Sequence, residues 1–108
     1  MAKFKFRLES YFSLKEKMEE QRKMEYGDAL LKLEEEKNIK IKFQNEYTML
    51  VSELKDNLNK KIIPSQQKTY NDYFSVIKKR IVKQDNVIKN AEFEVEKKRE
   101  LLSQAVKD

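Results

Sequence analysis

The fold is decided by the stretch Tyr70–Ala105, which reads YNDYFSVIKKRIVKQDNVIKNAEFEVEKKRELLSQA. Positions spaced alternately by four and three residues along it form a heptad a/d pattern, and nine of the eleven are apolar. These positions are Tyr70, Phe74, Ile77, Ile81, Gln84, Ile88, Ala91, Val95, Lys98, Leu102 and Ala105. Because this seam is narrower than the apolar face of a globular core helix, it predicts a long helix that pairs with one other long helix.

Length and composition agree with this interpretation. The chain has 108 residues, of which 40% are charged, with one glycine and one proline, as is typical of a single coiled-coil domain. No apolar run approaches the ~18 residues of a membrane span, and the N-terminus lacks the apolar segment of a signal peptide. We therefore expect a cytoplasmic protein. The net charge of +5 is modest and does not by itself require a nucleic-acid partner.

The partner helix is predicted from a second, weaker heptad pattern, in which seven of ten positions are apolar. They are Tyr26, Leu30, Leu33, Lys37, Lys40, Gln44, Tyr47, Val51, Leu54 and Leu58. An alternative face fits nearly as well, because its period is closer to that of an untwisted helix. It comprises Ile39, Phe43, Tyr47, Leu50 and Leu54. The sequence leaves these two phases open.

The two patterns are separated by a short break at Pro64. Proline disfavours helix at Ile63, and Ser65 is a suitable N-cap for a new helix. A short connection requires antiparallel helices. We therefore predict an all-α fold, a two-helix antiparallel coiled coil (αα-hairpin) with its turn near Ile63–Ser65. Residues 1–108 form one hairpin, with helices over about 4–62 and 65–106.

The seams also predict a register and an unpaired end. With the turn centred on Pro64, the expected facing pairs are Leu58 with Tyr70, Leu54 with Phe74, Tyr47 with Ile81, and Gln44 with Gln84. In this register residues 1–22 have no partner within the chain. They carry an apolar cluster of Phe4, Phe6, Leu8, Tyr11 and Phe12. An exposed apolar cluster of this kind usually marks a binding site for another protein.

No catalytic or ligand-binding constellation is present. The chain has no histidine and no cysteine, which excludes thiol chemistry and the usual zinc sites, and one glycine cannot build a phosphate-binding loop. Consecutive helical residues point in different directions, so Glu34–Glu36 is interpreted as a solvated run rather than a metal site. We expect no enzyme activity, no cofactor, no metal and no small-molecule ligand.

Two surface features leave alternatives open. The basic patch, Lys78–Arg80 with Lys83, is favoured as a solvated face, and its rival interpretation is a nucleic-acid-associated coiled coil. A generic structural hairpin without a dedicated partner is a third possibility. Phe43, Tyr47 and Tyr73 could gather at one level of the hairpin, either as a protein-binding surface or as packing beside the seam.

Three segments carry a resemblance to a known family. Phe4–Leu8 (FKFRL) leads into Leu14–Glu16, and Phe43–Tyr47 reads FQNEY. Gln66–Phe74 (QQKTYNDYF) is followed by Ile77 and Ile81. Together these segments resemble FliJ proteins, the small coiled-coil component of the flagellar type III export apparatus. Stalk proteins of the YscO type, from virulence secretion systems, share the architecture and are the nearest family with which it could be confused.

The resemblance implies a non-enzymatic antiparallel coiled coil similar to the gamma stalk of rotary ATPases. Such a protein stands in the centre of the export ATPase ring (FliI-like) and links it to the cytoplasmic domain of the export gate (FlhA-like). It also associates with export chaperones, at the cytoplasmic face of the membrane. We assign the ring contact to the apolar cluster Phe4, Phe6, Leu8, Tyr11 and Phe12. The gate-contacting residues carried over from the family are Glu36, Lys40, Phe43, Tyr47, Tyr73, Ile77, Arg80 and Gln84.

Overall fold

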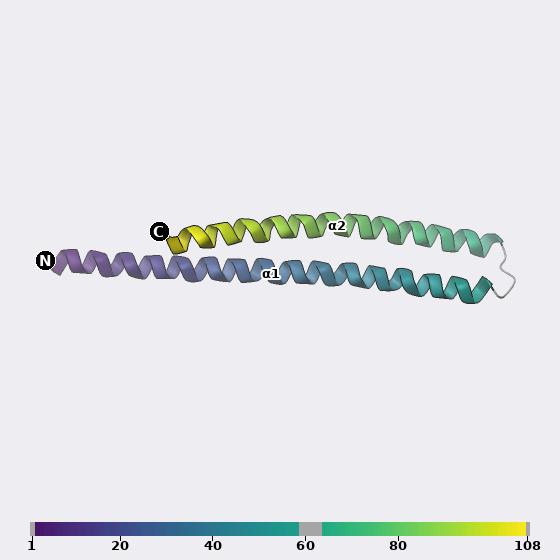
Figure 1. Ribbon diagram of the computed structural model, residues 1–108, viewed down its shortest axis with the longest axis horizontal. Coiled ribbons are helices and arrows are strands. Elements are labelled where there is room, and N and C mark those ends of the chain that lie inside the picture. The colour runs from purple at the N-terminus through teal and green to yellow at the C-terminus, as the bar shows by residue number, and fades with distance from the viewer. Residues whose placement is uncertain (1, 59–63, 108) are drawn as a thin grey trace. The chain divides into compact units, whose positions relative to one another are not determined.

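Two long helices make up the described part of the chain. The computed structural model describes residues 2–58 and 64–107, which form α1 (Ala2–Leu58) and α2 (Pro64–Lys107) (Figure 1). Every residue in these two ranges is helical, so no strand occurs within them. The predicted all-α fold is confirmed.

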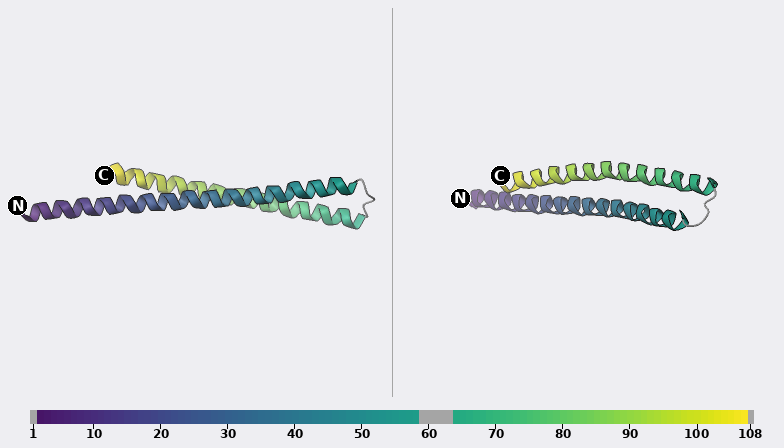
Figure 2. Two further views of the ribbon diagram at one scale, coloured as in Figure 1. Left: turned by 90° about the horizontal axis from the view of Figure 1, so that it is seen from below. Right: turned by 45° about the vertical axis from the view of Figure 1, so that its right-hand side comes forward.

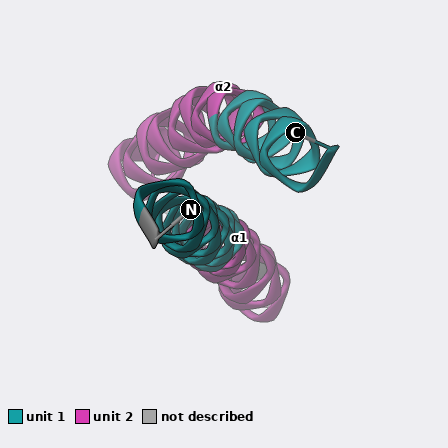
Figure 3. Cartoon of the chain, turned by 90° about the vertical axis from the view of Figure 1, so that its left-hand side faces the viewer, with its two compact units in different colours: residues 1–33, 91–108 teal, residues 34–90 magenta. Residues whose placement is uncertain are grey.

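The chain divides into two compact units (Figure 3). Unit 1 comprises Met1–Leu33 and Ala91–Asp108, and unit 2 comprises Glu34–Asn90. Within each unit a segment of α1 runs antiparallel to a segment of α2, and the separate views agree on this pairing (Figures 1 and 2). The predicted antiparallel pairing of two helices is therefore confirmed.

The helix ends near the connection differ from the sequence-based expectation. The described part of α1 runs to Leu58, the predicted end at residue 62 lies outside the described residues, and α2 begins at Pro64 itself. Proline suits the first position of a helix because no amide hydrogen is needed there and its backbone angle is already helical. Ser65 is consequently inside the first turn, where its carbonyl accepts a 3.0 Å hydrogen bond from Thr69 Oγ1. Ile63, also expected at the turn, lies outside the described residues.

The seam of α2 follows the predicted positions. All eleven predicted positions, from Tyr70 to Ala105, are buried or half-buried. Ile77 is the one fully buried side chain among the described residues, and Ile88 is 9% exposed. The strict four-three spacing explains this success, because each of these side chains returns to the same face of the helix.

The seam of α1 resolves the choice between the two phases. Its buried and half-buried positions run through Tyr26, Ala29, Leu33, Glu36, Lys40, Phe43, Tyr47, Leu50, Leu54 and Asn57. Leu30, Lys37 and Gln44 of the first predicted phase are exposed. Burying Phe43 instead of Gln44 removes more apolar surface from water, which favours the observed phase. Ile39, part of the alternative face, remains 37% exposed.

The predicted register is wrong by several residues. Tyr47 packs against Phe74 rather than Ile81, with ring centroids 5.3 Å apart. Gln84 is hydrogen-bonded to Glu36, and Gln44 is exposed to solvent. The register was predicted with Pro64 at the centre of the connection between the two helices. The connecting residues 59–63 all precede Pro64, so the true centre lies earlier in the chain.

Gly27 is an ordinary interior residue of α1. It has no positive φ angle, and a Cβ atom added to it would meet no other atom within 4 Å. Neither a special backbone conformation nor a close approach of another segment therefore requires glycine at this position.

Candidate functional site

The predicted gate-contacting residues divide into three groups by exposure. Glu36 and Gln84 are each 8% exposed and Ile77 is fully buried, so all three lie inside the seam of unit 2. The half-buried members are Lys40, Phe43 and Tyr47. Tyr73, at 54%, and Arg80 are exposed. A protein that binds this part of the chain can thus reach five of the eight residues, while the other three hold the two helices together.

A polar layer crosses the seam at Glu36 and Gln84. Gln84 Nε2 donates a 2.8 Å hydrogen bond to the main-chain oxygen of Glu36 and a 2.6 Å bond to its Oε2. Both amide hydrogens of Gln84 are therefore used. Beside this layer, Lys40 Nζ lies 2.6 Å from Asp85 Oδ1. The sequence analysis placed Gln84 opposite Gln44 and missed Glu36 as its partner. The alternative phase of α1 could have predicted this pairing. It replaces Gln44 by Phe43 in the seam, and the same shift of one residue replaces Lys37 by Glu36.

Aromatic side chains gather on the turn side of the polar layer. The rings of Tyr47 and Phe74 meet edge to face, with an interplanar angle of 65°. Nearer the turn, Asn57 Nδ2 donates a 2.7 Å hydrogen bond to the hydroxyl of Tyr70. Tyr73 instead presents more than half of its surface to solvent. Such an exposed aromatic beside packed ones is typical of a protein-binding surface.

The apolar cluster near the N-terminus is exposed throughout. Relative exposures are 71% for Phe4, 72% for Phe6, 39% for Leu8, 55% for Tyr11 and 60% for Phe12. Within unit 1 the N-terminal turns of α1 continue past the end of α2 (Figures 1 and 2). Of the cluster residues, Tyr11 lines a small cavity together with Ala105, near the end of α2.

The end of α2 lies against α1 beside the C-terminal part of this cluster. A small cavity of about 130 Å³ is lined by Tyr11, Leu14, Lys15, Met18 and Ala105. The sequence-based register placed Lys23 opposite Ala105, so α2 covers more of α1 than expected. Phe4, Leu8 and Tyr11 precede Lys15 at four-three spacing and therefore continue the face that packs against α2.

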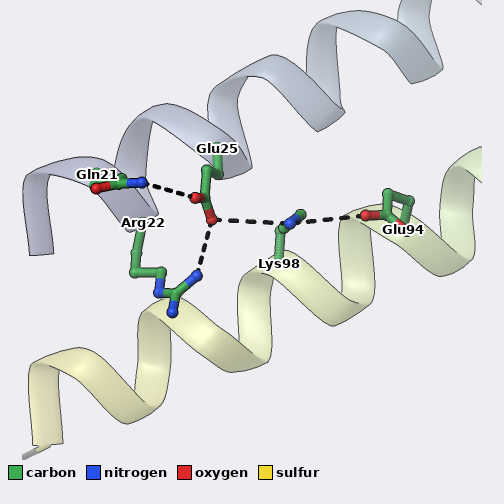
Figure 4. Close-up of polar contacts among 5 residues, drawn as sticks. All are labelled: Gln21, Arg22, Glu25, Glu94 and Lys98. Carbon is green, nitrogen blue, oxygen red and sulfur yellow. Dashed lines mark hydrogen bonds and ion pairs between the residues drawn. The ribbon is translucent and has the colours of Figure 1, made fainter. Parts of the chain in front are cut away.

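A charged cluster joins the two helices of unit 1 around Glu25 (Figure 4). Arg22 Nη1 donates a 3.1 Å hydrogen bond to Glu25 Oε2, and Gln21 Nε2 donates a 3.4 Å bond to Oε1. Lys98 Nζ, from α2, lies 3.8 Å from Glu25 Oε2 and also 3.8 Å from Glu94 Oε1. The hydrogen bond from Arg22, helped by Gln21 and Lys98, holds the pKa of Glu25 below its ordinary value. This explains how the seam position Lys98 tolerates a charged side chain.

The basic patch is a solvated helix face. Lys78, Lys79, Arg80 and Lys83 are exposed. None of them forms an ion pair with another residue that the structure describes. The four side chains lie on one helix, with no folded groove or interleaved aromatic ring among them, which a nucleic-acid site would need.

Other classes of site are not found in the described ranges. Residues 2–58 and 64–107 contain no group of three or more side chains that could hold a metal ion. Neither α1 nor α2, over the parts described, has a stretch long and apolar enough to cross a membrane.

Comparison with known proteins gives one match. A family model described as "Flagellar FliJ protein" matches residues 4–108, nearly the whole chain. No curated protein and no solved structure matches the chain significantly. The match covers both helices, including the apolar cluster, the polar layer and the aromatic side chains around Tyr47. The chain belongs to the FliJ family of flagellar proteins.

Proposed function

We propose that this protein is a stalk and coupling component of flagellar protein export, without catalytic activity of its own. Membership of the FliJ family makes it a flagellar export-related protein. In the proposed role it links the export ATPase ring (FliI-like) to the cytoplasmic domain of the export gate (FlhA-like) and associates with export chaperones. It would act in the cytoplasm, at the cytoplasmic face of the membrane.

The observation that carries the proposal is the exposure of the apolar cluster on a continuous helix. Phe4 and Phe6 each expose more than two thirds of their surface, and Lys3, Lys5 and Arg7 alternate with them. So much exposed aromatic surface on a helical end favours insertion into another protein. The helix presents most of these apolar side chains on one face and Phe6 on the opposite one, and such a helical end suits the central hole of a ring, where several subunits surround it.

We assign the gate contact to those predicted gate-contacting residues that a partner protein can reach. Tyr73 and Arg80 provide exposed surface, and Phe43 and Tyr47 add half-buried aromatic rings in the same unit. Glu36, Ile77 and Gln84 support this surface from inside the seam. Their contribution to gate binding would be indirect, through the packing of α1 against α2.

The test removes the apolar cluster and measures the ATPase. Deleting residues 2–12 should abolish stimulation of the export ATPase, whereas far-ultraviolet circular dichroism should retain the helical signal of the rest of the chain. The double variant Phe4→Ser with Phe6→Ser should reduce the stimulation without shortening the helix. Phe93→Ser is a matched control, because Phe93 is 80% exposed but lies on α2, away from the cluster.

Stimulation at full strength by the deleted protein would show that the ring binds elsewhere. Equal losses in the Phe4 and Phe6 double variant and in Phe93→Ser would show that the effect is not specific to the cluster. Either result would contradict the ring contact while leaving family membership unaffected.

A further inference from the structure

The two helices of unit 1 meet along a weak seam. No side chain that the structure describes in this unit is buried, because the buried residues Glu36, Ile77, Gln84 and Ile88 all belong to unit 2. Many half-buried seam positions of unit 1 hold charged side chains or alanine where a stable coiled coil has large apolar ones. These positions are Lys15, Glu19, Arg22, Ala29, Ala91, Lys98 and Ala105. Pairing of the helices in unit 1 therefore removes little apolar surface from water.

The seam of unit 1 also brings two like charges together. Arg22 of α1 and Lys98 of α2 both contact one carboxylate oxygen, Glu25 Oε2, at 3.1 and 3.8 Å (Figure 4). Without this carboxylate between them, the two cations would repel each other across the seam. Glu25 is therefore the side chain that allows the helices to stay paired at this level.

The part of α2 that belongs to unit 1, residues 91–107, covers a face of α1 that continues beyond it; we call this segment the strap. Tyr11 of the apolar cluster and Met18 line one cavity with Ala105 of the strap. Tyr26 follows on the same face of α1 and is half-buried. Separation of the strap from α1 would join Met18 and Tyr26 to the exposed cluster as one longer apolar face.

We propose that the strap is releasable, that Glu25 holds it closed, and that its release extends the binding face of the apolar cluster along α1. In the closed state a partner protein reaches only the N-terminal turns of α1. In the open state it also reaches Met18 and Tyr26. The identification of this partner as the export ATPase ring rests on the proposed function, whereas the opening is a property of the chain itself.

The opening is measured in the isolated protein by pulsed electron paramagnetic resonance. The chain has no cysteine, so two introduced cysteines carry all the spin labels. Labels at Glu20 and Glu100 report on unit 1, and labels at Asn45 and Ser75 report on unit 2, all at exposed positions. Glu25→Lys should raise the ratio of long to short distances in unit 1 by at least about fivefold, because three cations would then meet in the seam. The unit 2 distances should not change, and an unchanged distribution in unit 1 would overturn the proposal.

Glu96→Lys is the matched control for the charge at Glu25. It makes the same change of charge in unit 1, but the Glu96 carboxylate pairs with Arg99 of its own helix. Glutamate and lysine are both good helix formers, so circular dichroism should show equal helicity for the two variants. Equal opening in both would show that Glu25 does not hold the strap.

A charge swap tests the contact between the helices directly. Glu25→Lys with Lys98→Glu again places opposite charges on α1 and α2 at this level, and it should return the unit 1 distances towards those of the wild type. An opening as large as that of Glu25→Lys alone would contradict the assigned contact.

The effect on binding is tested by locking the strap. Lys15 and Ala105 line the same cavity, so Lys15→Cys with Ala105→Cys can be joined by a short bismaleimide. The linked protein should need at least about five times the concentration for half-maximal stimulation of the export ATPase, because the open state is no longer accessible. The same variant alkylated at both cysteines without a link is the control and should behave as the wild type.

The outcomes separate this inference from the proposed function. If the wild type stimulates the ATPase and the linked protein does so at the same half-maximal concentration as the unlinked control, the strap does not limit the binding face and this inference alone is wrong. If the wild type does not stimulate the ATPase, the ring contact of the proposed function fails, and the spin-label distances still decide whether the strap opens.

Discussion

Replacing Gln84 by alanine should destabilise the helix pair more than any surface substitution. Gln84 is 8% exposed, and its amide donates to both the main-chain oxygen and the carboxylate of Glu36. The hydrogen bond to the carboxylate contributes about 1.5–3 kcal/mol and that to the main chain about 1 kcal/mol. Truncation also removes one buried methylene group, Cγ, and leaves Glu36 without this donor in a buried seam. We expect a loss of about 3 kcal/mol in the free energy of unfolding.

The loss is measured by urea and thermal denaturation, followed by far-ultraviolet circular dichroism. For a chain of this size, a change of about 3 kcal/mol lowers the melting temperature by about 10–20 °C. Glu36→Gln is the matched control, because its side-chain oxygen still accepts the bond from Gln84 while the charge is removed. It should cost less than about 1 kcal/mol.

A double substitution separates hydrogen bonding from packing. Glu36→Leu with Gln84→Leu replaces the polar layer by an apolar one and should be at least as stable as the wild type, since buried charged groups contribute little net stability. If Gln84→Ala lies within about 0.5 kcal/mol of the wild type, the layer does not hold the seam as described. The same conclusion would follow if the double variant were as unstable as Gln84→Ala.

Two further predictions concern unit 1. Gly27→Ala should raise the free energy of unfolding by about 1 kcal/mol, because the position is an open helix interior and alanine has the higher helix propensity; an unchanged or lower denaturation midpoint would contradict this. The Arg22 hydrogen bond lowers the folded-state pKa of Glu25 from 4.5, so the carboxylate stabilises the fold above that pH and this contribution is lost as the pH falls through the lowered pKa. Denaturation of the wild type and Glu25→Gln should therefore differ at pH 7 and converge as the pH falls through the lowered pKa of Glu25, and a constant difference would exclude the assigned linkage.

The sequence predicted α2 better than α1, for a physical reason. Nine of the eleven seam positions of α2 are apolar, so one face of the helix dominates whatever its partner is. The seam of α1 contains Glu36, which neither predicted phase included and whose burial depends on Gln84 across the pair. Polar seam residues of this kind cannot be recognised from their own helix, because their favourable energy comes from the other one.

The prediction of the register and of the candidate site was limited in the same way, because both depend on how the two helices are aligned. The position of the turn was inferred from Pro64 as a helix breaker, whereas Pro64 is the first residue of α2. That difference hid the contact between Tyr47 and Phe74. Phe43 and Tyr47 are half-buried in the seam of α1, whereas Tyr73 is 54% exposed. Their different exposures follow from the register and could not be read from the sequence.

Few side chains of the helix pair are fully buried, and their positions determine where α1 and α2 should separate locally most easily. Ile77 is fully buried, and Ile88 and Gln84 lie close to it in exposure, whereas the other seam residues of α2 are half-buried. Separating one turn far from these residues exposes little apolar surface and so costs little free energy. Amide hydrogen exchange should therefore be slowest around Ile77–Ile88 and progressively faster towards Lys107. A bound partner would be detected as slowed exchange in the turns that it covers.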